Sequence, residues 1–167
     1  MLATLEQGNG LISLFWKHLY EQFFHAELWA PPGLHFAWTR ERDLYTGQIS
    51  YKVLVLLNAR SFNGLYGRNQ KMDGARSDCL AGCIARAWGQ ALRLPGPAPL
   101  ELVSFPTDPC TGEPHAVQMS QRDETAWRRL FTDTSSLCKD AGKPHGQGFC
   151  AFRTNNRVGY GRHPAPA

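Results

Sequence analysis

The sequence predicts an α+β fold, in which about three helices pack against a mostly antiparallel sheet. Two segments repeat apolar residues at helical spacing, and one segment alternates as a half-buried strand does. Eleven prolines and sixteen glycines in 167 residues indicate many turns and long loops rather than a helical bundle. Hydrophobic residues make up 43% of the chain, which is enough for a real core. We therefore expect one domain over residues 1–167, with a flexible tail from about His163.

Two helices are predicted from apolar periodicity. The first covers Leu11–Trp29 and ends before Pro31 and Pro32, because a residue that precedes proline avoids the helical region. The second runs from about Cys79 to Arg93, with its N-cap at Ser77 or Asp78. Pro95-Gly96-Pro97 stops it. Its apolar positions follow the i, i+3, i+4, i+7 pattern: Leu80, Cys83, Ile84, Ala87, Trp88, Ala91 and Leu92.

A third helix is expected after Ser120 and Asp123, whose spacing resembles a capping box. This helix is predicted to bury Trp127, Leu130 and Phe131.

The clearest strand pattern covers Gln48–Leu57. Its second half is apolar on both faces, which is typical of a central strand. Further strands are predicted at Leu34–Trp38, Leu100–Phe105 and His115–Met119, and a final hairpin at Phe149–Arg153 and Arg157–Tyr160.

The charge and the N-terminus suggest a soluble protein. The net charge of +4 and the pI near 8.9 are compatible with an acidic partner without requiring one. The apolar segment Leu11–Leu28 is interrupted by Lys17, His18 and Glu21, so it resembles neither a signal peptide nor a membrane span. We expect a cytoplasmic location without membrane contact, with export by a signal-less route as the alternative. Five cysteines in a reducing compartment predict no disulfide framework.

Cys79 is the residue most suggestive of chemistry. A thiol at a helix N-terminus meets free backbone N–H groups, which favour the thiolate. Cys79 also lies just outside the apolar face of its helix, so its sulfur need not be buried, whereas Cys83 lies on that face and is predicted to be a core residue. A nucleophilic cysteine also needs a base, an orienting group and an oxyanion donor, and no cofactor. The candidates are His115 as base, Asp123 (or Asn155 or Asn156) as orienting group, and Gln70 as oxyanion donor.

This arrangement resembles the papain-like cysteine peptidases and the papain-fold toxin domains. A glutamine, then a cysteine that begins a helix, then a histidine that opens a strand as His115-Ala-Val follow one another in the order of those families. The segment Asp78-Cys-Leu-Ala-Gly-Cys is similar to helix starts in papain-fold toxins. The resemblance covers only Gln70 to His115, and the interval from cysteine to histidine is short. It implies a thiol-dependent hydrolase that acts on peptide or amide bonds.

Other interpretations of these residues stay open. Cys79 and His115 are equally compatible with ordinary structural roles, and Asp123 with helix capping alone. Zinc is a weaker alternative, because Cys79, Cys83, Cys110 and His115 lack the tight Cys-x2-Cys spacing of structural sites. His25-Ala-Glu27 resembles half of a zinc-deaminase motif, but Glu113 stands where its second cysteine belongs.

Binding without catalysis is the second predicted function. The long polar loop between Asn58 and Asp78 interleaves cations with an aromatic residue, which is typical of nucleic-acid surfaces: Arg60, Tyr66, Arg68, Lys71 and Arg76. The tail repeats this pattern around Tyr160. Trp29 and Pro31 offer an alternative surface for a protein partner, as in an inhibitor. No Walker A, Gly-x-Gly-x-x-Gly or Gly-x-Ser-x-Gly motif occurs.

Overall fold

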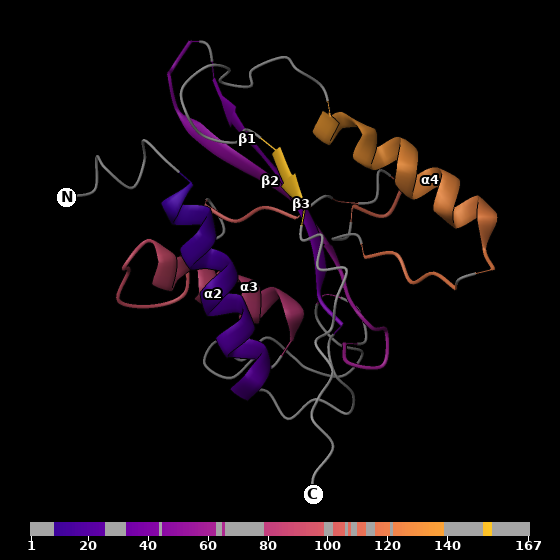
Figure 1. The fold of residues 1–167 in the computed structure, drawn as a ribbon, viewed down its shortest axis with the longest axis horizontal. Coiled ribbons are helices and arrows are strands. Elements are labelled where there is room, and N and C mark those ends of the chain that lie inside the picture. The colour runs from indigo at the N-terminus through magenta and orange to yellow at the C-terminus, as the bar shows by residue number, and fades with distance from the viewer. Residues whose placement is uncertain are drawn as a thin grey trace, which may run out of the picture.

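A computed structural model describes most of the chain (Figure 1). The described residues are 9–25, 33–43, 45–62, 65, 79–98, 102–105, 107, 110–112, 116–120, 122–138 and 152–154. In chain order the elements are α2 (Gly10–His25), β1 (His35–Arg42), β2 (Ile49–Leu56), α3 (Leu80–Ala91), α4 (Glu124–Thr134), the short 3-10 helix η1 (Ser135–Cys138) and β3 (Phe152–Thr154). The fold is α+β with an antiparallel sheet, as the sequence predicts.

The sheet has three strands in the described part of the chain, in the order β2-β1-β3. Both neighbours of β1 are antiparallel to it, and its register pairs Trp38 with Val53 on β2 and with Arg153 on β3. The prediction that Gln48–Leu57 forms the central strand is therefore wrong. The central strand is β1, which pairs with β2 on one side and β3 on the other. Accordingly Trp38 and Thr39, which point to opposite faces, are both buried.

The other strand predictions have mixed outcomes. β1 continues to Arg42, four residues beyond the predicted end, because all eight of its residues pair with β2. Residues 102–105 and 116–119 were expected in strands but form none, and Leu102 and Val117 are largely exposed. The first strand of the predicted final hairpin corresponds to β3, which pairs with β1. The second, Arg157–Tyr160, lies outside the described residues.

Helices α2 and α3 lie together on one side of the sheet, and α4 lies on the other (Figure 1). Of the apolar face predicted for α2, Ile12, Phe15, Leu19 and Phe23 are buried and Leu11 is half-buried. Trp16, next to this face, is buried too. These side chains form the main core with β1 and α3. Trp16 stacks on Phe36 with ring centroids 3.7 Å apart, so α2 is packed directly on the sheet.

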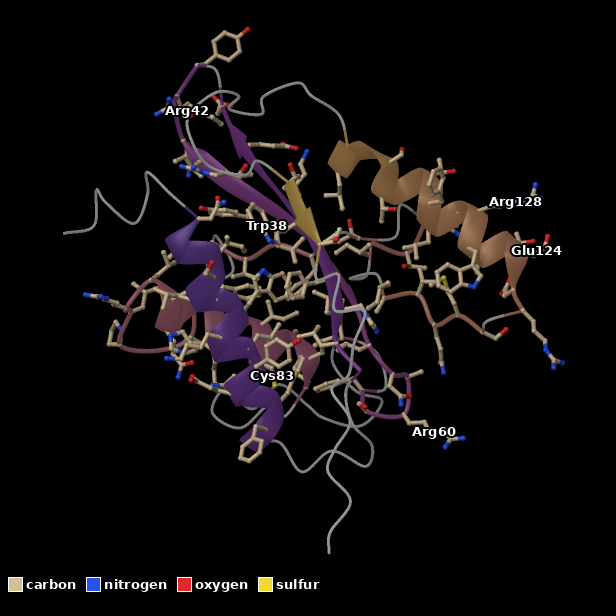
Figure 2. All side chains as sticks on the ribbon, viewed as in Figure 1. Trp38, Arg42, Arg60, Cys83, Glu124 and Arg128 are labelled. Carbon is tan, nitrogen blue, oxygen red and sulfur yellow. The ribbon has the colours of Figure 1, made fainter. Side chains whose placement is uncertain are left out.

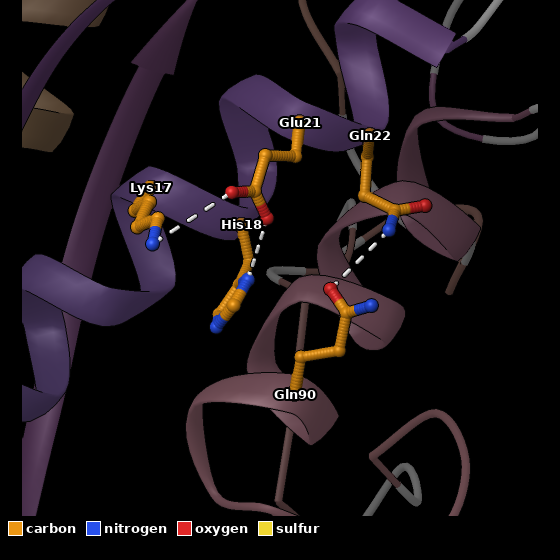
Figure 3. A network of polar contacts seen from close by, with 5 residues as sticks. All are labelled: Lys17, His18, Glu21, Gln22 and Gln90. Atoms are coloured by element: carbon orange, nitrogen blue, oxygen red, sulfur yellow. Dashed lines mark hydrogen bonds and ion pairs between the residues drawn. The ribbon is translucent and has the colours of Figure 1, made fainter.

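Polar side chains border the contact between α2 and α3 (Figure 3). The Gln22 amide donates to Gln90 Oε1 at 3.3 Å and accepts from Arg86 Nε at 2.9 Å. On the exposed side of α2, Glu21 lies 2.8 Å from His18 Nδ1 and 4.0 Å from Lys17 Nζ. These exposed pairs contribute little to stability.

Helix α4 is held differently from the other two. η1, which follows it directly, contacts β1 and buries Leu137. The predicted burial of Trp127 and Phe131 is wrong, since they are 41% and 76% exposed, while Leu130 is half-buried. Among the described elements, η1 rather than α4 makes the contact with β1.

Among the described residues, no helix is both long and apolar enough to cross a membrane.

Candidate functional site

Cys79 is the N-cap of α3. Its backbone is extended (φ −78°, ψ 155°), and its Sγ accepts a hydrogen bond from the Gly82 N–H at 3.4 Å. The Leu65 carbonyl accepts from the Ala81 N–H at 3.0 Å, which satisfies a second N–H of the first turn. The predicted N-cap at Ser77 or Asp78 is therefore wrong, because the sulfur and a loop carbonyl perform this role.

The environment of the Cys79 thiol is apolar. Only 8% of the residue is exposed, and it packs in a small cluster with Leu65, Ala81 and Phe105. The expectation that its sulfur need not be buried is wrong, because Leu65 and Phe105 pack against the start of α3. Cys83 is 1% exposed in the main core, as predicted, and accepts from Arg86 Nη2 at 3.5 Å.

The structure describes two of the four predicted catalytic residues. Asp123 is the N-cap of α4, where its Oδ1 accepts from the Ala126 N–H at 2.9 Å. Helix capping is thus the role that its contacts define. Gln70 and His115 lie outside the described residues, as do Asn155 and Asn156. Among the described residues, no three His, Cys, Asp or Glu side chains gather as metal ligands would, and Cys110 is exposed.

Arg60 is the described member of the predicted basic loop. It is exposed just after β2, in a turn where its N–H donates to Asn58 Oδ1 at 3.0 Å. Tyr66, Arg68, Lys71 and Arg76 lie outside the described residues.

The outer face of α4 is an aromatic and cationic surface that sequence reasoning missed. We call Trp127, Phe131 and the exposed Arg128 the α4 surface, and the exposed Glu124 lies one turn before Arg128. Trp127 and Phe131 are four residues apart and therefore share one side of the helix. Trp127 Nε1 donates to the Ser120 carbonyl at 3.2 Å, which fixes the orientation of the indole. Figure 2 shows Arg128 and Glu124 on the outer side of the helix.

The signal for this surface is present in the sequence. Trp127, Leu130 and Phe131 are the only large apolar residues of α4, and four charged residues stand among them between Glu124 and Thr134. So narrow an apolar face buries only part of a helix.

The turn between β1 and β2 is a second exposed feature. Asp43 Oδ1 accepts from the Thr46 N–H at 2.7 Å, the Tyr45 N–H at 2.9 Å and the Thr46 hydroxyl at 3.0 Å. These donors, the Thr46 N–H above all, lower the pKa of the Asp43 carboxyl below its ordinary value of 3.8. Tyr45 extends from this turn and is 98% exposed.

Asp43→Asn is expected to lower the free energy of unfolding at neutral pH, and this loss should depend on pH. Because the pKa of Asp43 is lowered in the fold, its ionised form stabilises the protein above about pH 4, and this contribution disappears as the pH falls through the folded pKa. Urea unfolding at pH 7, 5, 4 and 3 measures the difference between wild type and variant. The difference should shrink below pH 4. A difference that stays constant over this range would contradict the role of the charge.

Comparison with known proteins gives a family. Neither a curated protein nor a solved structure matches the chain. The model of the family described as the YagK/YfjJ C-terminal domain matches residues 24–154, which include every described strand, α3 and α4. The resemblance to papain-like peptidases stays a prediction. Since the match covers most of its 167 residues, the chain belongs to the YagK/YfjJ C-terminal domain family.

Proposed function

We propose that the protein is a binding protein that contacts nucleic acid. The observation that carries the proposal is the α4 surface, where two exposed aromatic rings lie on the same side of the helix as the exposed Arg128. Rings of this kind stack on bases, and guanidinium groups bind phosphates. The net charge of +4 favours a polyanionic partner.

Exposed apolar side chains on α4 carry a cost in free energy. Trp127 and Phe131 are large apolar side chains, and burying such a side chain typically stabilises a protein by about 2 kcal/mol. On α4 they are left in water beside charges, so a partner that covers them gains this free energy. A nucleotide suits this surface, because its base can cover a ring while its phosphate pairs with the neighbouring Arg128.

The test uses a fluorescently labelled single strand of about 20 nucleotides and a duplex of the same sequence. Wild-type protein should bind at 50 mM salt, with an affinity that falls steeply by 200 mM because counterions are released from phosphates. Phe131→Ala should weaken binding about tenfold, as the loss of one stacking ring does. This variant suits the test because Phe131 is 76% exposed, so its loss disturbs little packing.

Tyr20→Ala is the matched control. Tyr20 is a partly exposed aromatic residue on α2, on the other side of the sheet, and its removal should leave binding unchanged. Absence of binding by the wild type, or binding that added salt does not weaken, would contradict the proposal. Equal losses of affinity in Phe131→Ala and Tyr20→Ala would show that α4 is not part of the interface.

A thiol-dependent hydrolase is the second candidate. The position of Cys79 at the start of α3 supports it, because reactive cysteines occur at helix N-termini. The sulfur is engaged as the helix cap and only 8% of the residue is exposed, so a substrate has little access to it, which places this candidate second. His115 would be its base, Asp123 the orienting group and Gln70 the oxyanion donor, with a peptide or amide as substrate.

Iodoacetamide labelling at pH 6 tests this candidate. If Cys79 is an activated nucleophile, mass mapping should find it alkylated faster than Cys110, an exposed thiol of the same chain. Slower or equal labelling of Cys79 would contradict an activated nucleophile and agree with a structural cap.

A further inference from the structure

The tip of the β1–β2 hairpin is built as a rigid platform. Beyond the three bonds to Asp43 Oδ1, the Asp43 carbonyl accepts from the Gly47 N–H at 2.9 Å, and the Asp43 N–H donates to the Gln48 carbonyl at 2.9 Å. Gly47 has a φ of +70°, which glycine adopts without strain. The backbone that carries Tyr45 is therefore ordered before any partner arrives, and a partner does not bear that entropic cost.

Two side chains of this tip, an aromatic ring and a guanidinium, face solvent and are free to contact a ligand. Tyr45 is 98% exposed, so both faces of its ring are accessible. Arg42 is exposed at the end of β1, and its Nε donates to the Gly47 carbonyl at 3.3 Å. That bond orients the guanidinium at the tip end of the hairpin, where Figure 2 labels it.

Neither of the two described carboxylates next to Arg42 forms an ion pair with it. Glu41 Oε2 lies 2.9 Å from Lys52 Nζ, so this carboxylate has a cation of its own. The Asp43 carboxylate is directed into the turn, where three donors meet it. Each nearby carboxylate is thus engaged by donors other than Arg42.

The surroundings of Tyr45 favour a nucleobase over a protein pocket. An aromatic anchor of a protein interface is usually ringed by contacts that exclude water. The described neighbours at this tip are polar and exposed, namely Arg42, Asp43, Thr46 and Gln48. An exposed ring and an exposed guanidinium, three residues apart at one hairpin tip, match the base and the phosphate of a single nucleotide.

We propose that the hairpin tip binds one unpaired nucleotide, with its base stacked on Tyr45 and its phosphate bound by Arg42. This inference rests on the proposed nucleic-acid function and adds a second contact, at a part of the fold remote from the α4 surface. It makes the protein selective for single strands, because a base paired inside a duplex does not present a face to the ring.

The experiment measures the affinity of the full chain for the same labelled single strand and duplex. Tyr45→Ala should weaken single-strand binding about tenfold, and Tyr45→Phe should leave it unchanged because the ring remains. Arg42→Ala should weaken binding and reduce the salt slope by about one. Lys17→Ala and Tyr20→Ala, at exposed positions of α2, are the charge and ring controls and should bind as the wild type does.

The possible results separate the two proposals. A wild type that binds neither nucleic acid overturns the proposed function itself. A wild type that binds while Tyr45→Ala binds equally well overturns only the role of the tip. Equal weakening by Tyr45→Ala and Tyr45→Phe indicates a contact of the hydroxyl and overturns stacking. Equal losses for single strand and duplex overturn selectivity for unpaired bases. Unchanged thermal melting of Tyr45→Ala shows that its loss of affinity is local.

Discussion

Leu19→Ala is expected to lower the free energy of unfolding by about 3 kcal/mol, the largest effect among the substitutions considered for this fold. Leu19 is 0% exposed in the middle of α2, within the core that this helix shares with β1 and α3. The substitution removes buried methyl groups and leaves a cavity that a tightly packed core closes only in part. Urea denaturation followed by circular dichroism measures the change, with an unchanged m-value as the sign of intact two-state unfolding.

Phe24→Ala is the matched control on the same helix. Phe24 is 87% exposed, so its removal should change the free energy of unfolding by no more than about 0.5 kcal/mol. Similar losses for the two variants would contradict the packing of α2 described above, since that packing buries one side chain and exposes the other.

Gly89→Ala is expected to destabilise the protein by about 2 kcal/mol, although alanine is the better helix former. A Cβ at Gly89 would lie 2.3 Å from the Gly96 carbonyl oxygen and 2.9 Å from the Ala98 nitrogen. Both atoms belong to backbone, which is held in place because the Ala98 N–H donates to the Ala85 carbonyl at 2.9 Å. The segment after α3 folds back over the helix, and only a glycine leaves room for it.

Gly96→Ala is the control for this prediction. Nothing lies within 4 Å of a Cβ at Gly96, so this variant should unfold almost as the wild type does. The two are compared by urea unfolding under the same conditions. A Gly89→Ala protein as stable as the wild type, or more so, would mean that the segment 96–98 moves away from α3 without cost, contrary to the close approach.

The helices followed from the sequence to within a few residues. The apolar face of α2 and the core position of Cys83 depend on periodicity, which is a local property of the chain. The start of α4 was predicted to within one turn, but the predicted capping box is wrong, because Asp123 rather than Ser120 is the N-cap. The α+β class followed from the same local patterns.

The strands and the surface depended on contacts between distant segments. Alternation marked β2 as a strand, but the position of β1 between β2 and β3 depends on which strands pair, and β3 lies more than one hundred residues along the chain from β1. Periodicity alone does not say whether an element covers an apolar face. The exposure of Trp127 and Phe131 therefore could not be predicted from their spacing.

Cys79 shows, at a single residue, what the sequence determines and what only the tertiary structure decides. The sequence by itself determined that a cysteine stands at the start of an amphipathic helix, because that follows from the spacing of its neighbours. Only the tertiary structure decided that its sulfur caps the helix and lies against Leu65, while the Leu65 carbonyl accepts from the Ala81 N–H. Local spacing determines where a helix begins, whereas burial is determined by segments that fold over it from elsewhere in the chain.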